Sequence, residues 1–161
     1  MSKNKYLSLF LILLITFMAS AIGGFTTASF KEPWYSEIVL PTFNPPSWVF
    51  GPVWTTLYIL IATSAYRVVV SLDHSWNKWV PLAVGLWALQ LSLNTIWTPV
   101  FAGAQNLEVA LYYIVMLWVS IAAYIVVSWK IDRTASLIMV PYLAWVSFAT
   151  VLNYTYWQLN I

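Results

Sequence analysis

The chain has 161 residues, of which 61% are apolar and only 7% are charged, against about 25% charged in an ordinary soluble domain. A soluble fold of this size needs a polar surface, so the composition excludes both a soluble globular domain and a disordered chain. A net charge of +2 spread along the chain argues against nucleic-acid binding, and the absence of cysteine excludes disulfides and cysteine metal sites. A single membrane domain over residues 1–161 remains.

Apolar stretches, each near the roughly 20 residues needed to cross a bilayer, follow one another along the chain. Backbone groups inside hydrocarbon must bond within their own segment, and the stretches do not alternate as barrel strands do, so each is predicted to be a helix. The predicted helices cover residues 6–28, 47–71, 79–101, 107–129 and 134–157. The fold class is therefore an all-α membrane protein, a bundle of five transmembrane helices.

The first predicted helix has an alternative interpretation. An apolar run that follows two lysines and ends in Ala19-Ser20-Ala21 resembles a cleavable signal peptide. The apolar run nevertheless continues to Ala28, which makes it long enough to span. Small residues four apart, Ala19 with Gly23 and Ser20 with Gly24, also allow close helix contact. A retained first helix is the favoured prediction.

Residues 29–46 form the one long connection, and they combine four prolines with Trp34 and Tyr35. A loop of this length is either a lid or a disordered tether. Its apolar and aromatic content favours a packed lid, and residues 32–39 are predicted to form a short helix within it.

Lysine and arginine are distributed unevenly over the ends of the predicted helices. Lys31 lies in the long connection, and the other six basic residues belong to the opposite side: Lys3, Lys5, Arg67, Lys78, Lys130 and Arg133. Positive residues concentrate on the inner side of a membrane. The sequence therefore predicts an integral, multi-pass protein with its N-terminus inside, its C-terminus outside and the lid on the outer side.

The predicted bundle lacks the groups that most membrane chemistry needs. All charged residues lie in connections or within about one turn of a helix end, and Asp132 is placed to stabilise the start of the last helix. Proton-coupled transporters place carboxylates or histidines inside the bundle, whereas the single histidine, His74, lies in a connection. With no Ser-His-Asp set, no paired buried carboxylates and no phosphate-binding glycine loop, hydrolysis and phosphoryl transfer are disfavoured. No metal site is predicted.

Aromatic and amide side chains instead fall on single faces of three predicted helices. The helix over residues 79–101 carries such a stripe at helical spacing: Trp87, Gln90, Asn94, Trp97 and Phe101. The second and fifth helices carry similar faces: Trp54, Tyr58, Ile61 and Ala65, then Trp145, Ala149, Leu152 and Asn153. Amides are costly in lipid, so these faces should meet protein. Aromatic walls with a few amides indicate a pocket for a flat, mostly apolar ligand.

A purely structural interpretation stays open for part of this pattern. Asn94 and Asn153 could simply join helices. Several other tryptophans suit the belts at the membrane interfaces: Trp76, Trp79, Trp129 and Trp157.

Prolines interrupt the predicted helices at defined places. Pro52 and Pro81 are assigned to first turns, where proline is tolerated. Pro99 should end or kink its helix, and Pro141 should free backbone groups beside Trp145.

Four segments resemble the translocator protein and tryptophan-rich sensory protein family, also called the peripheral-type benzodiazepine receptor family. They are Pro33-Trp34-Tyr35, NPPSWVFGPVWTTLY (44–58), LQLSLNTIW (89–97) with FAGAQN (101–106), and PYLAWVSFATVLNY (141–154). The resemblance covers almost the whole chain in order and spacing. It implies a five-helix bundle, usually a homodimer, with a pocket opening toward the first loop. It also implies binding of porphyrins and haem-type tetrapyrroles and, in some members, of sterols and benzodiazepine-type drugs.

Carried over residue by residue, the resemblance assigns eight ligand-binding positions: Trp34, Trp54, Asn94, Trp97, Trp145, Phe148, Ala149 and Leu152. Trp54 and Trp145 match tryptophans implicated in porphyrin breakdown, which makes them the catalytic candidates. No cofactor is expected beyond porphyrin or haem as ligand. Two departures stand out: no basic residue follows Tyr154 to complete the proposed cholesterol motif, and Tyr113 stands where many members have an acidic residue.

The leading hypothesis is thus a tetrapyrrole-binding membrane protein that acts as a transporter, carrier or stress sensor. The alternatives are a light- and oxygen-dependent activity that degrades porphyrin, and a non-catalytic regulatory scaffold.

Overall fold

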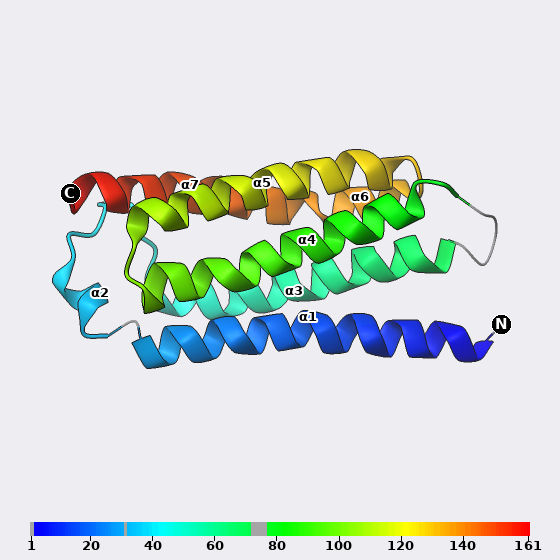
Figure 1. Ribbon diagram of the computed structural model, residues 1–161, viewed down its shortest axis with the longest axis horizontal. Coiled ribbons are helices and arrows are strands. Elements are labelled where there is room, and N and C mark those ends of the chain that lie inside the picture. Colours follow the sequence, from blue (N-terminus) through cyan, green and yellow to red (C-terminus); the bar gives the residue numbers. More distant parts are fainter. Residues whose placement is uncertain (1, 31, 72–76) are drawn as a thin grey trace.

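The computed structural model describes residues 2–30, 32–71 and 77–161, and the elements in these ranges are helical (Figure 1). Five segments of this part of the chain are long and apolar enough to cross a membrane: Lys5–Phe30, Ser47–Val70, Val80–Gly103, Leu107–Trp129 and Arg133–Leu159. These segments confirm the predicted bundle of five transmembrane helices, with ends that differ by a few residues.

Seven helical elements and one π-helical turn make up these spans and the lid. They are α1 (Ser2–Phe30), α2 (Trp34–Glu37), α3 (Ser47–Val70), α4 (Val80–Thr98), η2 (Pro99–Gly103), α5 (Leu107–Trp129), α6 (Arg133–Ile138) and α7 (Val140–Leu159). The first, second and fourth spans are single helices. The third combines α4 with η2, and the fifth combines α6 with α7.

Prolines determine where the regular α-helix is interrupted in the third and fifth spans. A proline has no N–H for the helical ladder, so α4 ends at Thr98, as predicted, and Pro99 begins a π-helical turn. The fifth span is not the continuous helix predicted over 134–157, because the chain turns at Met139, two residues before Pro141. Pro81 lies in the first turn of α4, whereas Pro52 is the sixth residue of α3 and therefore lies one turn deeper than predicted.

The long helices run side by side, and the two chain ends lie at opposite ends of the bundle (Figure 1). The end that holds the N-terminus also holds the α3–α4 and α5–α6 connections, whereas α2 and the C-terminus lie at the other end. Helix α1 packs on α3 and α4, α4 packs along α5, and α5 packs along α7. Helices α3 and α7 make little contact with each other.

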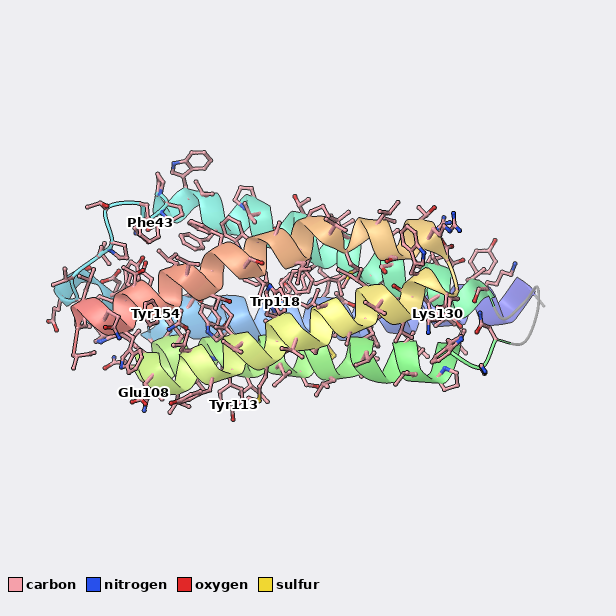
Figure 2. The ribbon with its side chains drawn as sticks, turned by 90° about the horizontal axis from the view of Figure 1, so that it is seen from above. Phe43, Glu108, Tyr113, Trp118, Lys130 and Tyr154 are labelled. Carbon is pink, nitrogen blue, oxygen red and sulfur yellow. The ribbon has the colours of Figure 1, made fainter. Side chains whose placement is uncertain are left out.

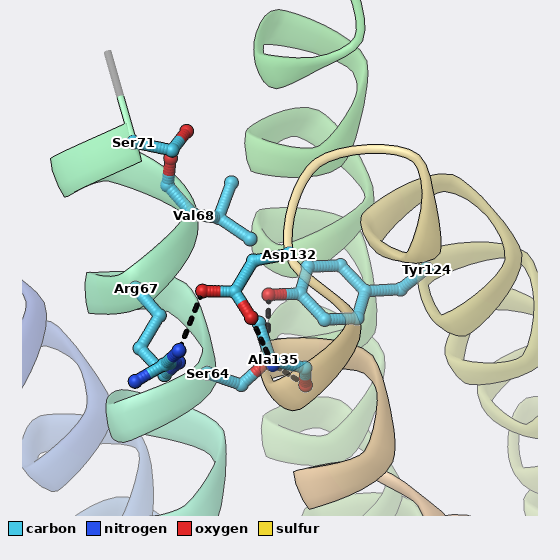
Figure 3. A network of polar contacts seen from close by, with 7 residues as sticks. All are labelled: Ser64, Arg67, Val68, Ser71, Tyr124, Asp132 and Ala135. Atoms are coloured by element: carbon cyan, nitrogen blue, oxygen red, sulfur yellow. Dashed lines mark hydrogen bonds and ion pairs between the residues drawn. The ribbon is translucent and has the colours of Figure 1, made fainter. Parts of the chain in front are cut away.

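At the end that holds the N-terminus, a polar network fixes α6 against α3 and α5 (Figure 3). Arg67 of α3 forms an ion pair with Asp132 at an Nη2–Oδ2 distance of 2.8 Å. Asp132 also caps α6, as predicted, by accepting a hydrogen bond from the Ala135 N–H (3.0 Å). Ser64 donates to the Ala135 carbonyl (2.7 Å) and lies 2.9 Å from the Tyr124 hydroxyl.

Aromatic and basic side chains meet at the same end of the bundle. The Lys130 ammonium lies 3.9 Å from the centre of the Trp79 ring, and the Arg133 guanidinium lies 5.4 Å from the Trp129 ring. Such cation–π pairs suit side chains at a membrane interface, where the aromatic ring can contact apolar surroundings while the charged group stays hydrated. Trp76 and His74 lie outside the described residues.

At the opposite end, residues 32–46 fold over the bundle and confirm a packed lid rather than a tether; we call them the lid segment. Helix α1 continues to Phe30, so this connection begins later than residue 29. Helix α2 spans Trp34–Glu37, within the short helix predicted over 32–39. Lys31, predicted as the outer basic residue, lies outside the described residues.

Candidate ligand-binding site

A cavity of about 500 Å³ lies between α1, α3, α4 and α7 beneath the lid segment. Small-molecule sites have volumes of roughly 300–1,000 Å³, so this cavity can hold an organic ligand. Helix α1 contributes small residues and the other helices contribute mainly rings, amides and hydroxyls. The lining includes Ser20, Gly23, Gly24, Thr27, Tyr35, Phe50, Trp54, Tyr58, Asn94, Trp97, Phe101, Trp145, Ala149, Leu152, Asn153 and Tyr156. None of the described lining residues carries a charge.

A buried hydrogen-bonded triad joins three helices at one side of the cavity. The Tyr58 hydroxyl of α3 donates to Asn94 Oδ1 of α4 at 2.6 Å, and Asn94 Nδ2 donates to the Tyr142 hydroxyl of α7 at 3.1 Å. Each of the three side chains is at most 5% exposed. Asn94 therefore joins helices and lines the cavity at the same time, so the two sequence interpretations of this residue coexist.

A second junction holds one aromatic wall in place. The Trp97 indole donates to Asn153 Oδ1 at 3.1 Å, and Asn153 Nδ2 donates to the Leu107 carbonyl at 2.9 Å. Trp97 also stacks on Phe101, with ring centres 4.9 Å apart and planes 25° apart. Because its N–H is satisfied inside the protein, Trp97 presents a fixed ring to the cavity.

Two further tryptophans face the cavity from α3 and α7. The Trp54 ring lies 5.7 Å from Tyr58 and meets the Tyr142 ring edge-on at 6.4 Å. The Trp145 ring lies 6.0 Å from Phe50 and 5.5 Å from Phe148. The cavity is thus bounded by indole rings from three helices, the arrangement that a flat ligand can stack against.

The lid segment closes the end of the cavity through hydrogen bonds to α7. The Tyr35 and Tyr156 hydroxyls are 2.7 Å apart, and both bond to the Asn44 side chain. Nearer the C-terminus, Asn160 accepts from the Val39 N–H at 2.8 Å and donates back to the Val39 carbonyl at 3.0 Å. Tyr35 and Tyr156 line the cavity, so the roof is built from both the lid segment and α7.

The structure brings six of the eight sequence-predicted positions to the cavity: Trp54, Asn94, Trp97, Trp145, Ala149 and Leu152. It places the other two outside the lining. Trp34 packs edge-on against Phe101 at 5.7 Å, behind the roof. Phe148 packs against Phe43 at 6.4 Å and faces the outer surface of the bundle, on the side where Figure 2 shows Phe43.

Other lining residues were absent from the predicted set. Phe50 lies four residues before Trp54, and Tyr156 lies four residues after Leu152. Extending each predicted helix face by one turn would therefore have included them. The sequence pattern indicates only a close-packing face for the small residues of α1. A Cβ on Gly23 would lie 3.5 Å from Thr98 Oγ1, so α1 and α4 do approach closely there. Tyr113, which stands where many relatives have an acid, lies on the outside of α5 and not in the lining (Figure 2).

Comparison with known proteins gives consistent matches over most of the chain. The model of the TspO/MBR family matches residues 10–158. The chain is 40% identical over 147 residues to protein CrtK of Rhodobacter capsulatus, which covers 91% of each chain. It is 41% identical over 145 residues to the tryptophan-rich protein TspO of Chlorobaculum tepidum, covering 89% of this chain and 90% of that one. It is 35% identical over 147 residues to the translocator protein of Homo sapiens, covering 89% of this chain and 86% of that one.

Proposed function

Because the chain belongs to the TspO/MBR family of membrane proteins, we propose that its central cavity binds tetrapyrroles such as protoporphyrin IX and haem-type porphyrins, together with other flat hydrophobic ligands. In this proposal the protein acts as a transporter, carrier or stress sensor.

The observation that carries the proposal is the set of indole rings on different sides of one uncharged cavity. Trp54, Trp97 and Trp145 come from α3, α4 and α7, so a planar ligand can contact more than one ring. Aromatic contacts of this kind are worth about 0.5–1.5 kcal/mol each beyond the burial of apolar area. The hydroxyls of Tyr35, Tyr58 and Tyr156 add polar groups at the edges of the cavity, where the polar substituents of a ligand can bond.

Binding without chemistry is the favoured form of the proposal. The described lining residues include no carboxylate, histidine or basic side chain that could transfer a proton or activate water. Trp54 and Trp145 both line the cavity, which keeps porphyrin degradation as the second candidate function. In that case excited porphyrin and oxygen would supply the reactivity, and the two indoles would be the candidate reacting groups of the protein.

A titration in light and in darkness separates these functions. The purified protein in lipid nanodiscs would be titrated with protoporphyrin IX, haem and a linear tetrapyrrole while absorbance and tryptophan quenching are followed. We expect saturable binding of at least one tetrapyrrole and an unchanged ligand spectrum in both conditions. A new bound absorbance that grows only in light and oxygen would show degradation instead. Absence of saturable binding by any member of the panel would refute the proposal.

Substitution of one cavity tryptophan tests the site itself. Trp145→Ala should weaken protoporphyrin IX binding by about tenfold or more, because loss of a buried aromatic contact costs roughly 1–3 kcal/mol. Trp129→Ala is the matched control, since Trp129 is exposed at the end of α5 and pairs with Arg133. The comparison is made by equilibrium quenching. Equal affinities of the two variants would show that Trp145 is not a wall of the binding site.

A further inference from the structure

A second hollow lies on the outer surface of the bundle, where α3 and α7 diverge. It is an open groove lined almost entirely by apolar side chains, among them Pro52, Val53, Leu57, Pro141, Ala144 and Trp145. Apart from the Trp145 indole, its single polar side chain is Thr56, whose hydroxyl donates a 2.9 Å hydrogen bond to the Pro52 carbonyl. Both helices belong to membrane-spanning segments, so this groove faces the hydrocarbon of the bilayer.

The groove and the central cavity share one wall. Trp145 lines both hollows, so its indole separates the cavity from the hydrocarbon. Within the described part of the chain, this indole makes ring contacts with Phe50 and Phe148 and packs against the hydrophobic core, and no hydrogen bond holds it. The other wall of the cavity differs, because the Trp97 indole is fixed by its hydrogen bond to Asn153. Rotation of the Trp145 side chain therefore breaks no hydrogen bond.

The helices on the two sides of the groove are joined near Tyr142 by the hydrogen-bonded triad and the Trp54–Tyr142 ring contact. Beside Trp145 they meet through its ring contact with Phe50. Helix α7 is held on its far side, where Trp118 of α5 donates to Ser147 Oγ at 2.7 Å (Figure 2), but it makes little contact with α3. The polar network of Figure 3 holds α6 on α3 through Ser64 and Asp132. The turn at Met139 then lies between the fixed α6 and α7, where a hinge would be.

The route from the aqueous side is closed more firmly. The lid segment is attached to α7 by the Tyr35–Tyr156–Asn44 cluster and by the paired bonds between Val39 and Asn160. Opening that end breaks several hydrogen bonds, each worth about 0.5–1.5 kcal/mol. Opening the groove displaces ring contacts against lipid chains that are themselves apolar.

From these observations we propose that flat apolar ligands pass between the bilayer and the cavity through the groove between α3 and α7, with the Trp145 indole as the movable partition. This inference rests on the proposed function, because it names the route to the same cavity. The ligand class is an apolar molecule dissolved in the membrane, rather than one captured from water through the lid.

Cross-linking tests the route directly, because the chain has no cysteine of its own and only introduced pairs can react. The groove pair is Thr56→Cys with Ala144→Cys, two exposed positions on opposite sides of the groove. The lid pair is Val39→Cys with Asn160→Cys, which replaces the hydrogen bonds there by a covalent link. A staple within α5, Tyr112→Cys with Met116→Cys, controls for modification at exposed positions. Each pair would be closed with a short bis-maleimide, and protoporphyrin IX transfer from lipid vesicles followed by stopped-flow quenching.

The groove pair should slow both association and dissociation by about tenfold or more once it is closed, with the equilibrium affinity unchanged within about twofold. Closing the lid pair or the α5 staple should leave both rates near those of the unlinked protein. If closing the lid pair slows protoporphyrin IX association and dissociation while closing the groove pair leaves both rates normal, the inference is overturned and the entrance lies at the lid.

A measurement without ligand keeps the two proposals separable. Spin labels at residues 56 and 144 report the width of the groove, and labels at residues 115 and 151 report the exposed edges of α5 and α7 as a matched control. In lipid, the groove pair should give a broader distance distribution than the control pair. Equally narrow distributions would refute the lateral opening even if protoporphyrin IX binds. Failure of the unlinked protein to bind any tetrapyrrole, with a broad groove distribution, would refute only the proposed function.

Discussion

Two amide side chains one helical turn apart on α4 have opposite surroundings. Asn94 is 4% exposed, and its oxygen and nitrogen both bond to tyrosine hydroxyls. Gln90 is fully buried, and among the described residues neither its Oε1 nor its Nε2 has a hydrogen-bond partner. The Thr16 hydroxyl and the Trp87 indole N–H share this condition. A buried polar group without a partner costs free energy, whereas a bonded one leaves orphaned partners when it is removed.

The difference predicts opposite effects of the same substitution. Asn94→Leu should lower the free energy of unfolding by about 1–3 kcal/mol, because it leaves the Tyr58 and Tyr142 hydroxyls buried without a partner. Gln90→Leu should leave stability unchanged or raise it, since it replaces an unsatisfied amide by an apolar side chain of similar size. Thermal unfolding of both variants in one detergent gives the comparison. If Gln90→Leu lowers the free energy of unfolding as much as Asn94→Leu does, the Gln90 amide forms hydrogen bonds, for instance to an internal water.

Among the elements, the lid segment depends on few contacts for its position. Its short helix α2 is too small to be stable by itself, and side chains of α7 hold the segment in place. Asn160 alone satisfies both backbone groups of Val39.

Removal of that side chain should therefore loosen the lid segment locally. Asn160→Ala should raise the hydrogen-exchange rate of the Val39 amide by about tenfold, because the loss of its acceptor exposes the N–H to water. Gln158→Ala, an exposed neighbour on the same helix, should leave this rate unchanged. Exchange would be followed by mass spectrometry of peptides that cover residues 32–46. Equal protection in both variants would mean that other contacts hold the segment.

For the molecule as a whole, the two ends of the bundle differ in chemistry. The described basic residues Lys5, Arg67, Lys78, Lys130 and Arg133 belong to helix ends and connections on the side that also holds the N-terminus (Figure 1). The lid segment and the C-terminus lie at the opposite end. An odd number of spans separates the two termini, and the positive residues indicate which end is inside.

Reporter fusions test this orientation. A reporter after Ile161 should be active outside and one before Lys3 should be active inside. Mass spectrometry of the purified protein should also give the mass that includes the first helix, because α1 packs Ile12, Thr16 and Ala19 against its neighbours. Both reporters on the same side would contradict the five-span topology. A mass that lacks the first 21 residues would instead establish the signal-peptide interpretation.

The sequence by itself determined the number of spans, the faces of the helices and the presence of a packed lid. Each follows from a local property: apolar length sets what can cross a bilayer, and the 3.6-residue period sets which side chains share a face. The stripe from Trp87 to Phe101 therefore lies on the inner side of its helix, as predicted.

Only the tertiary structure decided which faces meet, because that depends on how helices distant in sequence cross. It pairs Asn94 with Tyr58 and Tyr142, brings the small residues of α1 to the cavity, and leaves Trp34 outside it behind Phe101. It also leaves α3 and α7 apart, with Phe148 in the groove between them. Periodicity fixes the direction of a side chain relative to its own helix, but only packing fixes what that side chain touches.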